Sequence, residues 1–100
     1  MISKVAVPTA SASRYLQQLC KHWGHKFEVT FTPEHGEIRF GDGGTVAVMD
    51  AAADALHVRL ATADAETAER MEGVLARHIE RFAFREELKF DWTREDIELI

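Results

Sequence analysis

Cysteine, positive charge and long apolar runs are all scarce in this sequence, and each shortage excludes a class of protein. Cys20 is the single cysteine among 100 residues, so no disulfide can form within the chain, as is typical of the reducing cytosol. No apolar run approaches the roughly 20 residues needed to cross a bilayer, and residues 1–8 lack the apolar core of a signal peptide. We therefore expect a cytoplasmic protein without a membrane partner.

The shortage of positive charge also argues against nucleic acid as a partner. Lys and Arg number 12 against 17 Asp and Glu, which gives a formal net charge of -5. Binding to a duplex depends on clustered cations that displace counterions, and an acidic chain repels phosphate over most of its surface. We therefore expect no nucleic-acid partner.

Catalytic motifs are absent as well. The chain has serine only at Ser3, Ser11 and Ser13, none of them beside a histidine, so a nucleophile triad finds no support. The turn at residues 41–44 is rich in glycine but lacks the lysine and the following helix of a phosphate-binding loop. The sequence therefore favours a protein that is not an enzyme.

What the sequence does contain is the pattern of an ordinary globular domain. The hydrophobic fraction is 46% and the charged fraction 29%, and the length suits a single domain over residues 1–100. Apolar residues at three- and four-residue spacing predict two amphipathic helices, and alternation with period two predicts strands. The expected helices cover 12–23 and 65–84, and the expected strands cover 3–8, 27–31, 38–40, 46–48, 56–60 and 88–92.

Local signals set the expected ends of these elements. Thr9 or Ser11 can cap the first helix, and Asp64 can cap the second. Gly24 is expected in the left-handed position that ends the first helix, and Glu66 is expected to pair with Arg70 on the second. The segment 42–44 predicts a hairpin turn. Residues 93–100 fit no pattern and are expected to form a loosely ordered tail.

The resulting element order, β-α-β-β-β-β-α-β, predicts an α+β fold. Each helix has one apolar stripe, and the strands have one apolar face. The simplest packing places both helices on one face of a curved antiparallel sheet, as in the TATA-binding-protein-like and helix-grip architectures. This likeness of architecture predicts no function.

The second helix carries the main candidates for ligand binding. Arg77, Arg81 and Arg85 recur at four-residue spacing, and Arg81 has no acidic residue three or four positions away on this helix. Its partner is either a carboxylate from elsewhere, such as Asp91 or Glu95, or an anionic ligand held by the guanidinium groups.

His78 falls near the middle of the same helix's apolar stripe. It is either a core histidine bonded to backbone or to Tyr15, or a ligand-contacting group in a pocket between helix and sheet.

Two further features allow other functions. Cys20, His22 and His25 are metal-ligand types, so zinc or iron at His22 and His25 is an alternative, although Cys20 and His22 point to nearly opposite sides of a helix. The expected polar sheet face could equally form a homodimer; it consists of Glu28, Thr30, Glu37, Arg39, His57 and Arg59.

Several stretches resemble a known family. They are Arg14-Tyr15-Leu16, the segment LCKHWGHK at 19–26, the segment RHIERFAFREEL at 77–88, and Asp91-Trp92. Together they resemble the bacterial domain of unknown function family 2218 over residues 4–93, and residues 95–100 fall outside the likeness.

The resemblance implies a small bacterial cytoplasmic protein and no particular activity. It also implies the company of siderophore-reducing flavoproteins, and through them a link to iron metabolism.

The leading hypothesis is therefore a non-enzymatic binding or accessory module without a cofactor. Its partner would be a small anionic ligand, held by the three arginines with His78 or His22, or another protein. A metal-dependent protein using His22, His25 and His78 is the second hypothesis, and a structural homodimer is the third.

Overall fold

The structure, a computed structural model, describes residues 1–41 and 43–95. The strands are β1 (Ile2–Pro8), β2 (Glu28–Phe31), β3 (His35–Arg39), β4 (Val46–Ala51), β5 (Ala55–Ala61) and β6 (Thr93–Glu95), and the helices are α1 (Ala12–Trp23) and α2 (Ala65–Phe82). The strands form one sheet of order β2-β3-β4-β5-β1-β6, in which every neighbouring pair is antiparallel. The predicted α+β element order is confirmed.

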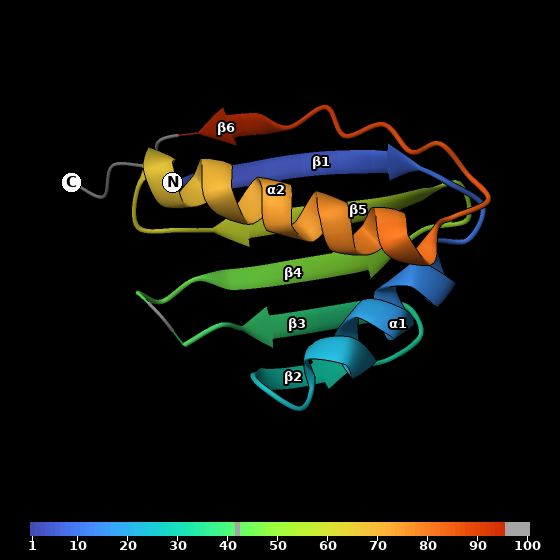
Figure 1. Cartoon of the computed structure of the whole chain (residues 1–100), viewed down its shortest axis with the longest axis horizontal. Helices are drawn as coiled ribbons and strands as arrows, with labels where there is room; N and C mark the ends of the chain where they lie inside the picture. The colour runs from blue at the N-terminus through green and yellow to red at the C-terminus, as the bar shows by residue number, and fades with distance from the viewer. Residues whose placement is uncertain (42, 96–100) are drawn as a thin grey trace.

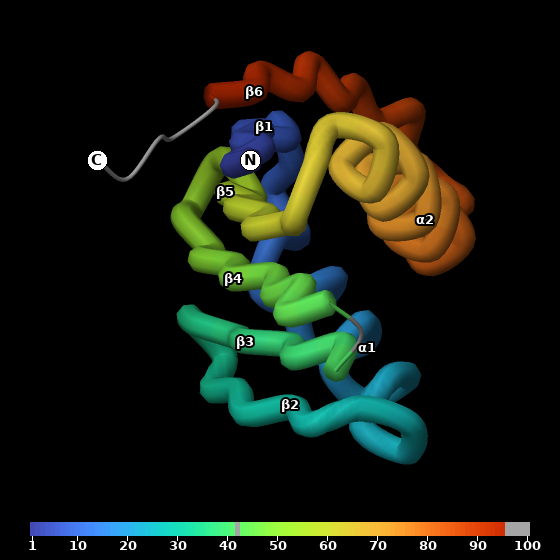
Figure 2. Tube along the Cα trace, turned by 90° about the vertical axis from the view of Figure 1, so that its left-hand side faces the viewer, coloured from blue at the N-terminus to red at the C-terminus, as the bar shows by residue number. Residues whose placement is uncertain are grey.

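Both helices lie on one face of the sheet, as the amphipathic patterns predict (Figures 1 and 2). α1 packs mainly against β2, β3 and β4, whereas α2 packs against β1 and β5. Figure 2 shows the sheet curving around the helices, with its other face uncovered. No helix within residues 1–41 and 43–95 is long and apolar enough to cross a membrane.

The core lies between the helices and the covered face of the sheet. Buried positions alternate along β1 and β5, while α1 buries residues at three- and four-residue spacing, so each element presents one apolar side. The largest side chains with almost no exposure are Leu16, Leu19, Ile38, Met49, Leu56, Leu60, Leu75 and Ile79. The opposite face carries the expected polar side chains, including Arg59 and Glu37, which lie on either side of Val48 in the strand register.

Several helix and turn signals are confirmed. Asp64 Oδ1 accepts a hydrogen bond from the Thr67 backbone N–H at 2.8 Å, which caps α2. Ser11 is the N-cap of α1 but makes no side-chain capping bond; the Thr9 hydroxyl accepts from its N–H at 3.0 Å. Gly43 and Gly44 have positive φ, as the hairpin turn requires, and Asp42 lies outside the described residues.

The prediction for the end of α1 is wrong. Gly24 has φ -62° and remains right-handed, because the chain continues in a turn in which the N–H groups of Lys26 and Phe27 both donate to the Trp23 carbonyl. The glycine instead accommodates a close backbone approach, since a Cβ at this position would lie 3.2 Å from the Cys20 carbonyl oxygen.

The last strand is also misplaced by the sequence prediction. Residues 88–92 form no strand, although Leu88, Phe90 and Trp92 pack against the core as expected for apolar side chains. The strand is β6 at 93–95, which pairs with β1. Alternation of apolar and polar residues predicts which side chains are buried, but a strand also needs a neighbouring strand with which its backbone can form hydrogen bonds. Residues 93–95 are thus ordered, and 96–100 lie outside the described residues.

Candidate functional site

A pocket with a volume of about 370 Å³ lies between the two helices and the β3–β4 end of the sheet. α2 contributes Arg70, Met71, Val74 and His78; α1 and its following turn contribute Trp23, Lys26 and Phe27; the β3–β4 connection contributes Phe40 and Thr45. In Figure 1 the two helices diverge over this part of the sheet. This volume falls in the range of small-molecule sites.

Three aromatic rings form one wall of the pocket. Trp23 and Phe40 have centroids 5.1 Å apart, Phe27 and Phe40 4.9 Å apart, and both pairs meet edge to face. Edge-to-face packing fixes ring orientation beyond the effect of apolar burial. Trp23 is buried, so the wall is anchored in the core and exposes its partly buried Phe27 and Phe40 toward the pocket.

His78 closes the side of the pocket next to α1. Its Nδ1 lies 2.7 Å from the Val74 carbonyl oxygen, and its ring packs on Trp23 with centroids 4.8 Å apart and on His22 with centroids 5.4 Å apart. The prediction of a backbone partner is therefore confirmed, and the alternative of Tyr15 is wrong. His78 is also half-buried and lines the pocket, and contact with a ligand stays a prediction.

Among the residues that the structure describes, the charged ones that line this pocket are all cationic. Lys26 and Arg70 contribute to the lining, and no carboxylate within residues 1–41 and 43–95 does. The expected Glu66–Arg70 ion pair does not form within the part of the chain that the structure describes, so Arg70 is available to the pocket. In a chain with net charge -5, a pocket whose described charged lining residues are both cations is suited to a negatively charged group.

Of the three arginines predicted to form a stripe, only Arg77 and Arg81 lie on α2. Arg77 and Arg81 lie exposed on α2, but Arg85 follows the helix end at Phe82 and extends over the Phe84 ring, 5.4 Å from its centroid. None of the three arginines makes an ion pair with a described residue; Glu95 instead lies 4.0 Å from Lys4, and Asp91 makes no pair. The structure therefore places these arginines outside the pocket lined by His78.

Tyr15 belongs to a different network. Its hydroxyl donates to Glu86, which also accepts from the Thr9 hydroxyl at 3.0 Å. Burial, together with the neighbouring Glu86 carboxylate, raises the pKa of Tyr15. This network joins α1 to the segment after α2 and does not reach the pocket.

Only two of the proposed metal ligands, His22 and His78, are brought side by side in the part of the chain that the structure describes. Cys20 is buried in the core, where burial raises its pKa to about 11, whereas His22 and His25 are exposed. His22 lies beside His78, and His25 follows the end of α1. Among residues 1–41 and 43–95 there is no group of three or more His, Cys, Asp or Glu side chains placed to hold a metal ion. Zinc or iron binding stays a prediction from the sequence.

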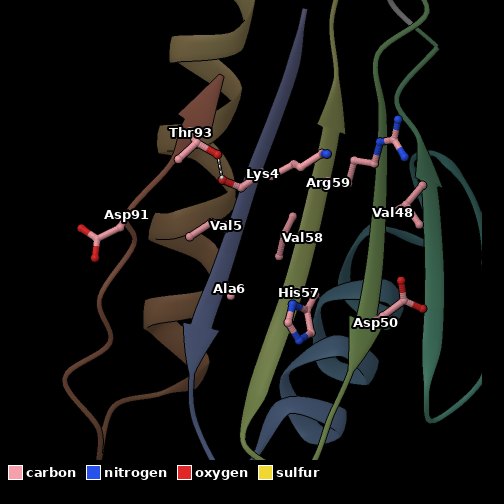
Figure 3. Close-up of a pocket in the computed structure, with 10 residues that line it drawn as sticks. All are labelled: Lys4, Val5, Ala6, Val48, Asp50, His57, Val58, Arg59, Asp91 and Thr93. Carbon is pink, nitrogen blue, oxygen red and sulfur yellow. Dashed lines mark hydrogen bonds between the residues drawn. The ribbon is translucent and has the colours of Figure 1, made fainter. Parts of the chain in front are cut away.

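A second hollow, of about 310 Å³, lies on the uncovered face of the sheet (Figure 3). Lys4, Arg59, Asp50 and Asp91 contribute to it from β1, β5, β4 and the segment before β6. Cations and carboxylates are mixed there, and no aromatic ring other than the His57 imidazole lines it. Because it offers neither one sign of charge nor a stacking surface, it is a weaker candidate for a ligand site.

Sequence reasoning missed a buried ionic network that joins α2 to β1 and β6. Glu72 is buried and accepts hydrogen bonds from Ser3 Oγ at 2.6 Å, Arg94 Nε at 2.7 Å and the second guanidinium nitrogen at 2.9 Å. The hydrogen bonds with Arg94 lower the pKa of Glu72. The signal was available, since Glu72 lies four residues after Ala68 and three before Leu75 on the inner stripe.

Comparison with known proteins finds a solved structure that is similar to this chain in both fold and sequence. The solved NMR structure of PA4090 from Pseudomonas aeruginosa is similar, with 42% sequence identity, a TM-score of 0.77, and coverage of 92% of this chain and 94% of that one. No curated protein matches the chain. A family model described as "Uncharacterized protein conserved in bacteria (DUF2218)" matches residues 4–93. Because this match covers nearly the whole chain, the protein belongs to that bacterial family of uncharacterised function.

Proposed function

We propose that this protein binds a small aromatic anion in the pocket between its two helices and its sheet. The observation that carries the proposal is the composition of that pocket, in which Trp23, Phe27 and Phe40 line an apolar wall and Lys26 and Arg70 are the charged lining residues. An apolar pocket with a few convergent polar groups is the usual form of a small-molecule site. The proposal keeps the anionic ligand predicted from the sequence and moves its site.

The two halves of the pocket make different demands on the ligand. The aromatic wall favours a flat apolar body, which gains from burial and from contact with ring faces and edges. The two cations favour a carboxylate or phosphate, and an arginine can bind either one through two parallel hydrogen bonds. A ligand with only the apolar body would contact only the aromatic wall, and a ligand with only the anionic group would contact only the two cations.

A direct test compares ligands that carry one or both features. 3-Phenylpropionate and phenyl phosphate have both, acetate and inorganic phosphate have the charge without the ring, and benzyl alcohol has the ring without the charge. Chemical-shift changes of backbone amides in the ¹⁵N-labelled protein would locate and quantify binding. We expect the aromatic anions to perturb the pocket amides at lower concentration than either control. No perturbation by either aromatic anion at millimolar concentration would overturn the proposal.

Matched variants separate the pocket from the arginine stripe. The pair Lys26→Gln and Arg70→Gln removes the pocket cations, whereas Arg77→Gln and Arg81→Gln removes the same number of exposed cations elsewhere. Each exposed cation contributes about 0.5–1 kcal/mol, or about two- to fivefold in affinity. We expect the first pair to weaken aromatic anions and leave benzyl alcohol unchanged. An equal loss in the second pair would overturn the placement of the anion at Lys26 and Arg70.

The other predictions from the sequence rest on weaker support. The siderophore-reducing flavoprotein and the link to iron metabolism follow from the family resemblance alone. The homodimer rests on the uncovered polar sheet face, and light scattering at high protein concentration tests it directly. A monomer under those conditions would count against the dimer and leave the pocket proposal intact.

A further inference from the structure

The imidazole of His78 indicates a second property of the ligand, in addition to the ligand's negative charge. Nδ1 lies 2.7 Å from the Val74 carbonyl oxygen. A carbonyl oxygen can only accept a hydrogen bond, so Nδ1 carries the hydrogen and donates. In the neutral ring, Nε2 then has a lone pair and no hydrogen. The helix therefore fixes His78 as a hydrogen-bond acceptor at Nε2.

This acceptor has no partner within the described chain. No hydrogen bond to His78 Nε2 is formed by any residue in 1–41 and 43–95, although the ring is half-buried and lines the pocket. Its nearest aromatic neighbours, Trp23 and His22, pack against the ring rather than bond to it. Because the ring lines the pocket, a hydroxyl group on a bound molecule can donate to this nitrogen.

The positions of the polar groups along α2 set where that donor belongs. Arg70 and His78 are eight residues apart, so their Cα atoms are separated by about 12 Å at 1.5 Å per residue. Both line the same pocket. An anionic group bound by Arg70 and a hydrogen-bond donor bound by His78 must therefore lie well apart on the bound molecule.

From this geometry we infer that the ligand is an elongated aromatic acid with a hydroxyl group remote from its anionic group. The inference rests on the proposed function and refines it. The hydroxyl donates to His78 Nε2, the ring lies against Trp23, Phe27 and Phe40, and the anion lies near Arg70 and Lys26. A para-hydroxylated acid has this shape, whereas an ortho-hydroxylated acid places both groups at one end and cannot reach both partners.

The test uses acids that differ in one feature at a time. 3-(4-Hydroxyphenyl)propionate has the remote donor, its 4-methoxy analogue keeps the size without the donor, its 2-hydroxy isomer moves the donor, and 3-phenylpropionate lacks it. Dissociation constants from titration calorimetry should favour the para-hydroxy acid by about fivefold or more over the other three, as expected for one hydrogen bond to a pocket acceptor. Equal affinities across the four acids would overturn the inference and leave aromatic-anion binding intact. If none of the four binds, the proposed function fails with it.

Two variants assign the preference to one residue. His78→Phe keeps a ring against Trp23 but removes Nε2, so it should abolish the preference for the para-hydroxy acid and retain binding of 3-phenylpropionate. His22→Gln changes the neighbouring imidazole, which does not line the pocket, and should retain the preference. A preference that survives in His78→Phe would overturn the assignment.

A measurement on the unmodified protein gives an independent answer if His78→Phe does not fold. In histidine labelled with ¹⁵N, a nitrogen that accepts a hydrogen bond changes its chemical shift. The Nε2 resonance of His78 should therefore shift on binding of the para-hydroxy acid and remain in place with the methoxy analogue. Identical behaviour with both acids would overturn the inference.

Discussion

Replacing Glu72 by glutamine should destabilise the protein substantially, although the two side chains have nearly the same size. The Glu72 carboxylate accepts from Ser3 at 2.6 Å and from two Arg94 nitrogens at 2.7 and 2.9 Å. Glutamine offers one acceptor oxygen and turns an NH₂ donor toward one of these donors. Losing hydrogen bonds to a buried charged group costs about 2 kcal/mol, which corresponds to a fall in Tm of about 10 °C for a domain of this size.

Urea unfolding followed by tryptophan fluorescence and by circular dichroism measures this loss. Arg94→Gln leaves the buried carboxylate without its guanidinium partner and should also destabilise, and the double variant should lose less than the sum of the two. Lys4→Gln is the control, because Lys4 and Glu95 are exposed and 4.0 Å apart. The reasoning is refuted if Glu72→Gln unfolds within about 0.5 kcal/mol of the parent protein.

The same network has a predictable pH dependence. The pKa of Glu72 is lower in the folded protein than in the unfolded chain, mainly because of its hydrogen bonds with Arg94. A depressed carboxyl pKa stabilises the fold above the unfolded pKa, and this contribution is lost as the pH falls through the folded pKa. The difference in unfolding free energy between the parent and Glu72→Gln should therefore shrink at acid pH. A difference that grows under acid conditions would contradict the assignment.

Three further predictions concern other parts of the fold. Gly36→Ala should destabilise the protein by about 1–3 kcal/mol in urea unfolding, because a Cβ there would lie 2.9 Å from the Cys20 sulfur. Gly73→Ala should stabilise the protein by about 0.5–1 kcal/mol, because a Cβ there meets only the movable end of an arginine side chain. A Gly73→Ala variant less stable than Gly36→Ala would contradict this packing. Hydrogen bonds to Asp50 and Glu37 raise the pKa of His35. The stabilising effect of protonated His35 is therefore present at low pH and is lost as the pH rises through its folded pKa. Asp50→Asn should lower the NMR titration midpoint of His35, and an unchanged midpoint would refute this cause. Burial raises the pKa of Cys20 to about 11, so iodoacetamide at pH 8 should alkylate it far more slowly in the native protein than in denaturant, as mass spectrometry would show; equal rates would contradict its burial.

Sequence reasoning recovered the elements whose local pattern and tertiary burial agree. The helix around Leu16 and Leu19 and the strand containing Leu56, Val58 and Leu60 carry one apolar side each, and that side is buried. The same agreement placed both helices on one face. Local pattern failed where the backbone partner decides, as at β6, whose three exposed residues show no apolar alternation.

The pocket was only half predictable. His78 was found because a histidine on an apolar stripe is conspicuous. Lys26 and Arg70 were not, because their role depends on how the turn after α1 meets a helix more than forty positions later. Arg81, which sequence spacing singled out, lies exposed outside the pocket. Spacing along one helix identifies which side chains share a side of that helix, but not which residues of other elements lie opposite them.

The interior place of β1 in the sheet has a consequence for synthesis on the ribosome. β1 is made before both of its neighbours, β5 and β6, so residues 2–8 have no strand beside them until residues 55–61 have emerged. Until then the covered side of β1 remains exposed to water and to other nascent chains. We expect β1 to be among the last strands to gain protection from hydrogen exchange during translation, because its pairings join residues far apart in the sequence.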